Sequence, residues 1–182
     1  MNAKLLINIQ KQKLTDHNTP EKPYLCHIGT YKKTDNNMHN ITFFEVTEPK
    51  EAYRSAVNNL LTQLSQNAKP MTIDEMTYLA TCNESHLFFL CIDNKIIGMS
   101  TLAVYRSPIG CKAWIEDVVV DKDYRGQGLG RTFIERTIKE AKRFAPCSLL
   151  LTSRPSRIEA NALYQSIGFG KRETNVYKME II

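Results

Sequence analysis

The chain has 182 residues, of which 42% are hydrophobic and 24% are charged, and its formal net charge is +5. This size and composition predict one compact domain without disulfide or metal staples, and they exclude an intrinsically disordered chain. No apolar run approaches the roughly 20 residues that a bilayer-spanning helix needs, and the N-terminus lacks a signal-peptide pattern. We therefore expect a cytoplasmic protein with no membrane partner.

The cysteines and histidines do not form a metal-binding or disulfide pattern. Five cysteines and four histidines are scattered along the chain, without a C-x-x-C pair or histidines at ligand spacing. A zinc site or a disulfide framework needs regular close pairs. We expect free thiols and no metal.

The positive charge is concentrated at the N-terminal end. Residues 1–37 hold six lysines and three acidic residues, whereas the remainder is nearly balanced and has no basic tract. Turn-forming residues also cluster there, so residues 1–40 are predicted to be an extension that is partly disordered or peripheral. The balanced charge of the rest disfavours a nucleic-acid partner, although docking of the basic extension to nucleic acid or an acidic protein stays an alternative.

Residues 41–182 have the apolar periodicity of a mixed α/β domain. The predicted elements are, in chain order, a strand over 41–46, helices over 49–64 and 72–79, strands over 86–92, 95–105 and 113–120, a helix over 132–144, a strand over 147–152, a helix over 156–167, and closing strands from 169 onward and over 176–182. Thr72 and Glu75 form a capping-box signature for the second helix. Asp93 and Asn94 form a turn signal between two strands.

A glycine-rich segment follows the strand predicted over 113–120. Arg125-Gly126-Gln127-Gly128-Leu129-Gly130-Arg131 lies between that strand and a helix. Alternate glycines let backbone N–H groups converge at a helix N-terminus, which suits a pyrophosphate. A turn that needs unusual φ angles is the alternative. The spacing fits neither the G-x-G-x-x-G dinucleotide motif nor the G-x-x-x-x-G-K-S/T nucleotide loop.

Two motifs resemble the GCN5-related N-acetyltransferase (GNAT) superfamily. Residues 125–130 match its R/Q-x-x-G-x-G/A acetyl-CoA signature, and residues 160–169 match its A-x-x-L/F-Y-x-x-x-G-F landmark. The resemblance covers about residues 41–182, an N-acetyltransferase domain. It implies an α/β (α+β) fold with a mixed central sheet flanked by helices. Acetyl-CoA would bind between two splayed parallel strands, here those over 113–120 and 147–152.

The resemblance also implies which residues contact acetyl-CoA. Backbone groups at the strand end would pair with the pantetheine arm, and the glycine-rich segment would hold the pyrophosphate. An asparagine and a tyrosine further along the chain would lie beside the arm and the thioester. These residues are Val118, Val119, Val120, Arg125, Gly126, Gln127, Gly128, Leu129, Gly130, Arg131, Asn161 and Tyr164.

Glu116 and Tyr164 are the predicted catalytic residues. An amine with a pKa of about 10 must lose a proton before it attacks a thioester, and the departing thiolate needs a proton donor. Polyamine acetyltransferases have a similar L-E-D-x-x-V strand, so the resemblance makes Glu116 the base, acting through water, and Tyr164 the acid. Asp117 would bind a substrate ammonium. Adjacent strand residues face opposite sides of a sheet, so both carboxylates reach one pocket only if a family bulge relaxes this rule.

Each assignment has an alternative. Glu116 could instead pair with a basic residue, and Tyr164 could be a core aromatic. Trp114 and Tyr105 could line the acceptor pocket, although aromatic strand residues usually pack. The arginines Arg154, Arg157 and Arg172 could contact the cofactor's 3′-phosphate or be solvated.

The predicted function is acetyl-CoA-dependent N-acetyl transfer to a primary amine, directly and within a ternary complex. The paired carboxylates favour a small cationic amine such as a polyamine, while a protein amine, an aminoglycoside or an amino acid stays open. A catalytically silent acyl-CoA sensor or scaffold of the same fold is the alternative. A strand edge near the C-terminus is compatible with a homodimer.

Overall fold

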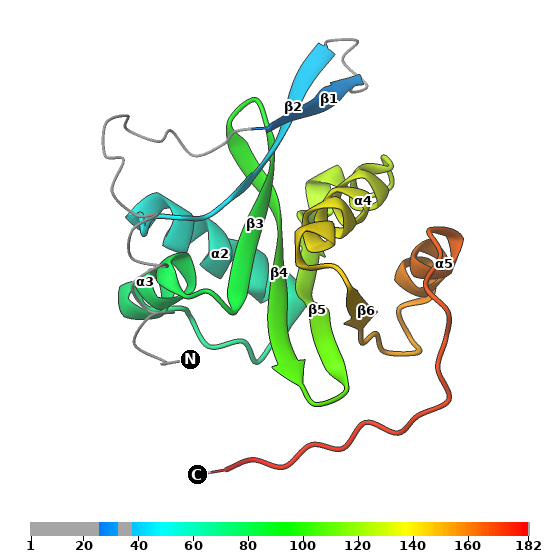
Figure 1. Ribbon diagram of the computed structural model, residues 1–182. Coiled ribbons are helices and arrows are strands. Elements are labelled where there is room, and N and C mark those ends of the chain that lie inside the picture. The colour runs from blue at the N-terminus through cyan, green and yellow to red at the C-terminus, as the bar shows by residue number, and fades with distance from the viewer. Residues whose placement is uncertain (1–25, 33–37, 182) are drawn as a thin grey trace.

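The computed structural model describes residues 26–32 and 38–181. Its centre is one mixed six-stranded sheet with helices on both faces (Figure 1). This arrangement confirms the predicted α/β (α+β) fold class. Most of the predicted N-terminal extension, residues 1–25 and 33–37, lies outside the described residues.

The strands follow one another across the sheet in chain order. They are β1 (Cys26–Lys32), β2 (Met38–Glu45), β3 (Ser85–Ile92), β4 (Lys95–Ser107), β5 (Gly110–Val120) and β6 (Cys147–Leu151). Neighbouring strands are antiparallel except β5 and β6, which are parallel. A parallel pair needs a crossover connection, and a helix provides it here.

The helices divide between the two faces of the sheet. They are α2 (Glu51–Leu64), α3 (Ile73–Thr81), α4 (Leu129–Ala141) and α5 (Ile158–Ser166). In Figure 1, α2 and α3 cover one face, whereas α4 and α5 lie on the other. Each face has its own apolar core: Val57, Leu60 and Met76 pack on the first, and Phe133 and Ile134 pack on the second.

Two local sequence signals, a capping box and a two-residue turn, are confirmed by the structure. Thr72 accepts a hydrogen bond from the Glu75 backbone N–H, and the Glu75 side chain accepts one from the Thr72 N–H, which completes the capping box of α3. Asp93 and Asn94 have φ angles of 46° and 69° in the turn between β3 and β4. Both residue types tolerate this left-handed conformation, which a two-residue hairpin requires.

The sheet extends further toward the N-terminus than the predicted boundary at residue 41. β2 begins at Met38, and β1 pairs with it from Cys26 to Lys32. Sequence periodicity missed β1 because polar and turn-forming residues surround it, and pairing with β2 supplies its backbone hydrogen bonds.

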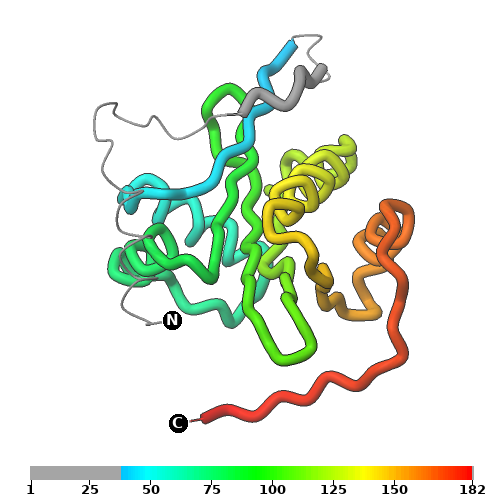
Figure 2. Tube along the Cα trace, in the orientation of Figure 1, coloured from blue at the N-terminus to red at the C-terminus, as the bar shows by residue number. Residues whose placement is uncertain are grey.

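The predicted closing strands at 169 onward and 176–182 are wrong. Residues 169–181 form no strand in the structure and leave α5 as an extended trace (Figure 2). The Phe169 N–H still donates to the Tyr164 carbonyl at 3.0 Å, but Val176 and Tyr177 are largely exposed. A strand needs a partner edge as well as an apolar pattern, and this segment has the pattern alone.

No described helix is both long and apolar enough to cross a bilayer.

Candidate active site

A β-bulge interrupts β5 where the two predicted carboxylates lie. Met99 pairs with Val119 and Thr101 pairs with Glu116, so one residue of β4 faces two residues of β5. Asp117 is the extra residue, with a φ of 52°. Aspartate tolerates this left-handed conformation better than most residues do.

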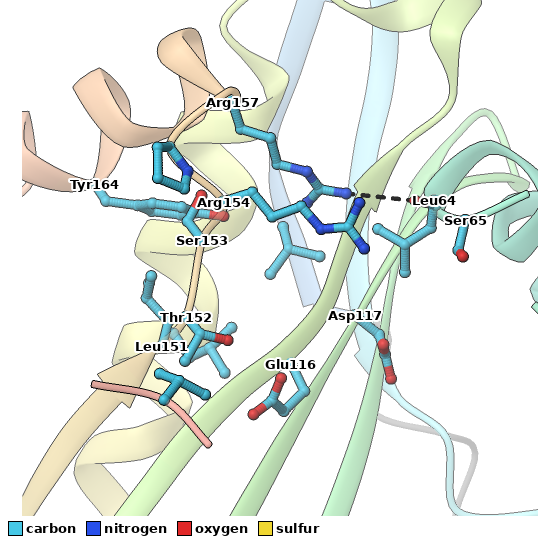
Figure 3. Close-up of a pocket in the computed structure, with 14 residues that line it drawn as sticks. Leu64, Ser65, Glu116, Asp117, Leu151, Thr152, Ser153, Arg154, Arg157 and Tyr164 are labelled. Atoms are coloured by element: carbon cyan, nitrogen blue, oxygen red, sulfur yellow. Dashed lines mark hydrogen bonds between the residues drawn. The ribbon is translucent and has the colours of Figure 1, made fainter. Parts of the chain in front are cut away.

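The bulge coincides with the point where β5 and β6 separate. Their parallel pairing ends at Ile115 and Leu151, one residue before Glu116. An open pocket of about 530 Å³ lies at this separation (Figure 3). Its walls come from the end of α2, the bulge, the loop after β6, α5 and the C-terminal segment: Leu64, Ser65, Ile115, Glu116, Asp117, Val118, Leu151, Thr152, Ser153, Arg154, Pro155, Arg157, Tyr164 and Val176.

Both carboxylates line this one pocket. Glu116 is half-buried, and burial together with the nearby Asp117 charge raises the pKa of Glu116 above its usual value. Desolvation by the surrounding walls also raises the pKa of Asp117, although its side chain is open to solvent. A carboxylate with a raised pKa is a stronger base once ionised.

Tyr164 of α5 faces the carboxylates from the opposite wall (Figure 3). Its side chain is only 8% exposed, and its ring packs edge-on against Phe169 with the centroids 6.2 Å apart. Burial raises the pKa of Tyr164, so its hydroxyl keeps its proton at neutral pH. The residue therefore belongs to the core and also lines the pocket.

The glycine-rich segment forms an exposed loop that ends at the N-terminus of α4. Gly126 and Gly128 have φ angles of 74° and 76°, which explains glycine at both positions. Within the described chain, the backbone N–H groups of residues 126–128 donate to no other group. The Arg125 Nε donates to the Val120 carbonyl at 2.9 Å and ties the loop to the end of β5. Free N–H groups at a helix N-terminus fit a pyrophosphate.

The other residues that are predicted to contact the cofactor differ in which of their groups are accessible to a ligand. Val118 and Val120 pack toward the core under α4, and Val119 packs toward α2; Val118 also lines the pocket. Leu129 is buried in the same core as Val118. A Cβ on Gly130 would lie 3.7 Å from the Leu163 side chain, an ordinary van der Waals contact, so α4 has room for a side chain at this position.

Arg131 and Asn161 make contacts within the protein. Arg131 bridges α4 and α5, because it donates to Glu135 at 3.2 Å and to Ser166 at 2.5 Å. The Asn161 side chain donates to the Arg154 carbonyl at 2.9 Å, and Asn161 is not among the residues that line the pocket. Its predicted contact with pantetheine stays a prediction.

Trp114 and Tyr105 lie outside the residues that line the pocket. Trp114 pairs with Ala103 and Tyr105 pairs with Lys112, two and four residues along β5 from Glu116. Tyr105 is 46% exposed, and the Lys112 Nζ lies 5.9 Å from the centre of its ring. Their predicted role in acceptor binding therefore lacks support from the pocket geometry.

The pocket also contains groups to which sequence analysis gave no role in it. Leu64 and Ser65 come from the carboxyl end of α2, and no motif connects them with β5. The Ser153 Oγ is buried and has no hydrogen-bond partner among residues 26–32 and 38–181. No described group of histidine, cysteine, aspartate or glutamate side chains could hold a metal ion.

A family model described as the acetyltransferase (GNAT) family matches residues 54–169. The chain belongs to the GNAT family. This match covers the bulge, the glycine-rich loop and α5, so the elements around the pocket belong to the shared domain. The GNAT chain is an N-acetyltransferase, and acetyl-CoA is the co-substrate of its family.

Relatives of this GNAT acetyltransferase act on different amines. The ribosomal protein bS18-alanine N-acetyltransferase of Escherichia coli (strain K12) is 30% identical over 134 residues, which span 74% of this chain and 82% of the relative. Streptothricin acetyltransferase A of Bacillus subtilis (strain 168) is 33% identical over 92 residues, about half of either chain. Membership of the family therefore leaves the acceptor open.

Solved structures share the fold of this GNAT acetyltransferase. An aminoglycoside acetyltransferase, meta-AAC0020 from an uncultured soil metagenomic sample, solved with sisomicin, has a TM-score of 0.68 at 18% identity, over 78% of this chain and 96% of its own. Aminoglycoside N-acetyltransferase AAC(6')-Iy in complex with CoA has a TM-score of 0.62 at 13% identity, over 78% and 95%. At such identity the likeness shows the fold alone.

Proposed function

We propose that this GNAT enzyme transfers the acetyl group of acetyl-CoA directly to the primary amine of a small cationic acceptor. The observation that carries the proposal is the bulge in β5. It brings Glu116 and Asp117 into one pocket, with Tyr164 on the facing wall.

The glycine-rich loop, which lies outside the residues that line the pocket, is suited to a phosphorylated arm. The unpaired N–H groups of residues 126–128 and the N-terminus of α4 hold the pyrophosphate. The arm then lies in the gap beyond Ile115 and Leu151, where β5 has lost its partner strand. The arm takes the place of β6 there and pairs with the backbone groups of Val118 and Val120.

Glu116 and Tyr164 each move one proton of the reaction. Glu116 removes a proton from the acceptor ammonium through a water molecule, and the neutral amine attacks the thioester carbon. A C–N bond forms, the nitrogen of the tetrahedral intermediate releases its second proton to water, the C–S bond breaks, and a backbone N–H of β5 stabilises the oxyanion. Tyr164 donates its phenolic proton to the departing thiolate.

The acceptor side of the pocket favours a positive charge. Glu116 and Asp117 both carry carboxylates, and the carboxyl end of α2 adds the carbonyl groups near Leu64 and Ser65. The Leu64 carbonyl already accepts a hydrogen bond from the Arg157 guanidinium, so the two carboxylates are the groups that favour a cation here. A polyamine supplies a second ammonium for Asp117 while its first ammonium reacts at Glu116.

A protein N-terminal amine is the second candidate acceptor. The relative from Escherichia coli that acts on ribosomal protein bS18 aligns with 74% of this chain. Such an amine must also lose a proton before it attacks the thioester, so the two candidate acceptors differ only in the groups attached to the reacting amine. Turnover with different acceptors separates the two candidates.

The first experiment is calorimetric titration of the purified protein with acetyl-CoA. We expect micromolar binding that Gly130→Glu abolishes, because a carboxylate in the first turn of α4 repels the pyrophosphate. Gly130 has no strained φ, so the variant keeps its fold. Gly170→Glu adds the same charge at an exposed glycine outside the loop and serves as the control. A folded protein without binding would contradict the cofactor assignment.

The second part of the test compares acceptors. Spermidine, a peptide with an N-terminal alanine and sisomicin are each supplied with acetyl-CoA, and release of free CoA is measured. We expect the highest kcat/KM with spermidine. A faster peptide or aminoglycoside would contradict the small cationic acceptor while leaving acetyl transfer intact.

A further inference from the structure

Arg157 crosses the mouth of the pocket from α5 to α2. It occupies the N-cap position of α5, and its Nη2 donates to the Leu64 carbonyl at the end of α2 over 3.4 Å (Figure 3). Tyr164 lies on the side from which Arg157 comes, and Leu64 lies on the side that it reaches. The guanidinium therefore connects two walls between which the described residues form no backbone hydrogen bond.

Backbone contacts fix both ends of this connection. The Arg154 carbonyl accepts the Arg157 backbone N–H at 3.0 Å and the Asn161 side chain at 2.9 Å, which holds the turn before α5. At the other end, the Gln63 side chain accepts the Lys122 N–H at 2.8 Å and ties α2 to the segment after β5. Arg157 thus reaches from one anchored segment to another.

The charge of Arg157 acts on the Tyr164 hydroxyl. Burial raises the pKa of Tyr164, and the Arg157 guanidinium opposes this rise. The other charged groups that line the pocket are Arg154, from the loop after β6, and Glu116 and Asp117, from β5. Phe169, which packs against the Tyr164 ring, adds no charge.

We propose that Arg157 is a positioning residue that assists Tyr164 as the proton donor of acetyl transfer. When the phenolic proton moves to the thiolate, negative charge develops on the Tyr164 oxygen, and the anchored guanidinium stabilises it. Tyr164 regains a proton from solvent before the next turnover. The inference rests on the proposed function, since it needs Tyr164 to act as the acid.

A double-mutant cycle tests the inference with the acceptor that turns over fastest. Arg157→Gln is expected to lower kcat about tenfold and to change KM for acetyl-CoA less than about twofold. Arg157→Lys keeps the charge and is expected to restore most of kcat. In a Tyr164→Phe background, Arg157→Gln is expected to have little further effect, because the group through which it acts is gone.

The pH dependence of kcat gives an independent readout. In the wild type, ionisation of Tyr164 lowers kcat on the alkaline side, and Arg157→Gln moves this limb to higher pH because it removes the nearby positive charge. Tyr164→Phe should lack the limb altogether. Arg157 is largely exposed, so Arg157→Gln should melt like the wild type.

Two results would overturn the inference. Losses of kcat that multiply in the double variant would show that Arg157 acts independently of Tyr164. A large rise in KM or in the calorimetric Kd at unchanged kcat would make Arg157 a direct ligand of the cofactor. A wild type that binds acetyl-CoA but acetylates no amine would overturn the proposed function itself, and this inference with it.

Discussion

At the residue scale, the pKa of Glu116 depends on the neighbouring Asp117 carboxylate. Burial and the Asp117 charge raise the pKa of Glu116, so its ionised, basic form appears at a higher pH than for a free glutamate. Activity that depends on this base must therefore rise with pH along an acid limb above the usual value of 4.5.

Substitutions at these positions test the base. Glu116→Gln is expected to lower kcat at least about a hundredfold while acetyl-CoA binding is retained. Asp117→Asn removes the neighbouring charge and should move the acid limb of kcat/KM to lower pH. Kinetics from pH 5 to 9 and calorimetry measure both effects. An unchanged rate in Glu116→Gln would exclude it as the base.

At the element scale, the bulge in β5 depends on a residue that tolerates a φ of 52°. Asp117→Gly is expected to keep the stability of the fold within about 0.5 kcal/mol, because glycine adopts this conformation freely. Asp117→Val places a β-branched side chain there and should cost about 1–2 kcal/mol.

Urea denaturation of the two variants separates strain from charge. Both lack the carboxylate, so a shared loss of activity reports its chemical role, and the difference in unfolding free energy reports the bulge. Equal stability of the two variants would show that the bulge persists without a left-handed residue.

Most elements were predictable from the sequence because their signals are local. The capping box of α3, the turn at Asp93 and Asn94, and the glycine loop each lie within a few residues, and the structure has all three. The motifs also led to the bulge, through the family resemblance. β1 and the extended C-terminal segment were not predicted, because a strand depends on a partner that the local sequence does not contain.

The pocket walls also include residues that local sequence signals could not predict. Glu116 and Tyr164 come from motifs, whereas Leu64 and Ser65 reach the pocket only through the packing of α2 on the sheet. The Arg157 side chain was assigned to phosphate or solvent from sequence, since nothing local indicates its contact with a carbonyl 93 residues away.

At the scale of the whole molecule, Glu45 connects three distant segments. It contacts His86 of β3 through Oε1 at 2.6 Å and Arg143, just after α4, through Oε2 at 2.7 Å. Burial alone would raise the pKa of Glu45, but these hydrogen bonds and charges lower it from 4.5 to about 2. The ion pair therefore holds the end of α4 against β2 and β3.

The lowered pKa predicts a loss of stability in acid. The unfolded chain binds a proton near pH 4.5 and the folded chain only near pH 2, so the contribution is complete above pH 4.5 and is lost as the pH falls toward 2. Its size is on the order of 3 kcal/mol. Glu45→Gln should flatten the dependence of unfolding free energy on pH over this range.

A matched variant completes the test. Glu173→Gln removes an exposed carboxylate that the described residues leave without an ion pair, and it should follow the wild-type curve. If Glu45→Gln and Glu173→Gln gave the same pH dependence, the Glu45 contacts would not stabilise the fold.

The rest of the fold does not depend on the bulge that forms the site. Without Asp117, the side chains of β5 alternate regularly: Ile115, Val118 and Val120 face α4, while Glu116 and Val119 face the other way. Asp117 is thus a one-residue insertion that changes the side of no other side chain. Insertion or deletion of this one residue would therefore make or remove the bulge and leave the inward-facing side chains of both cores in place.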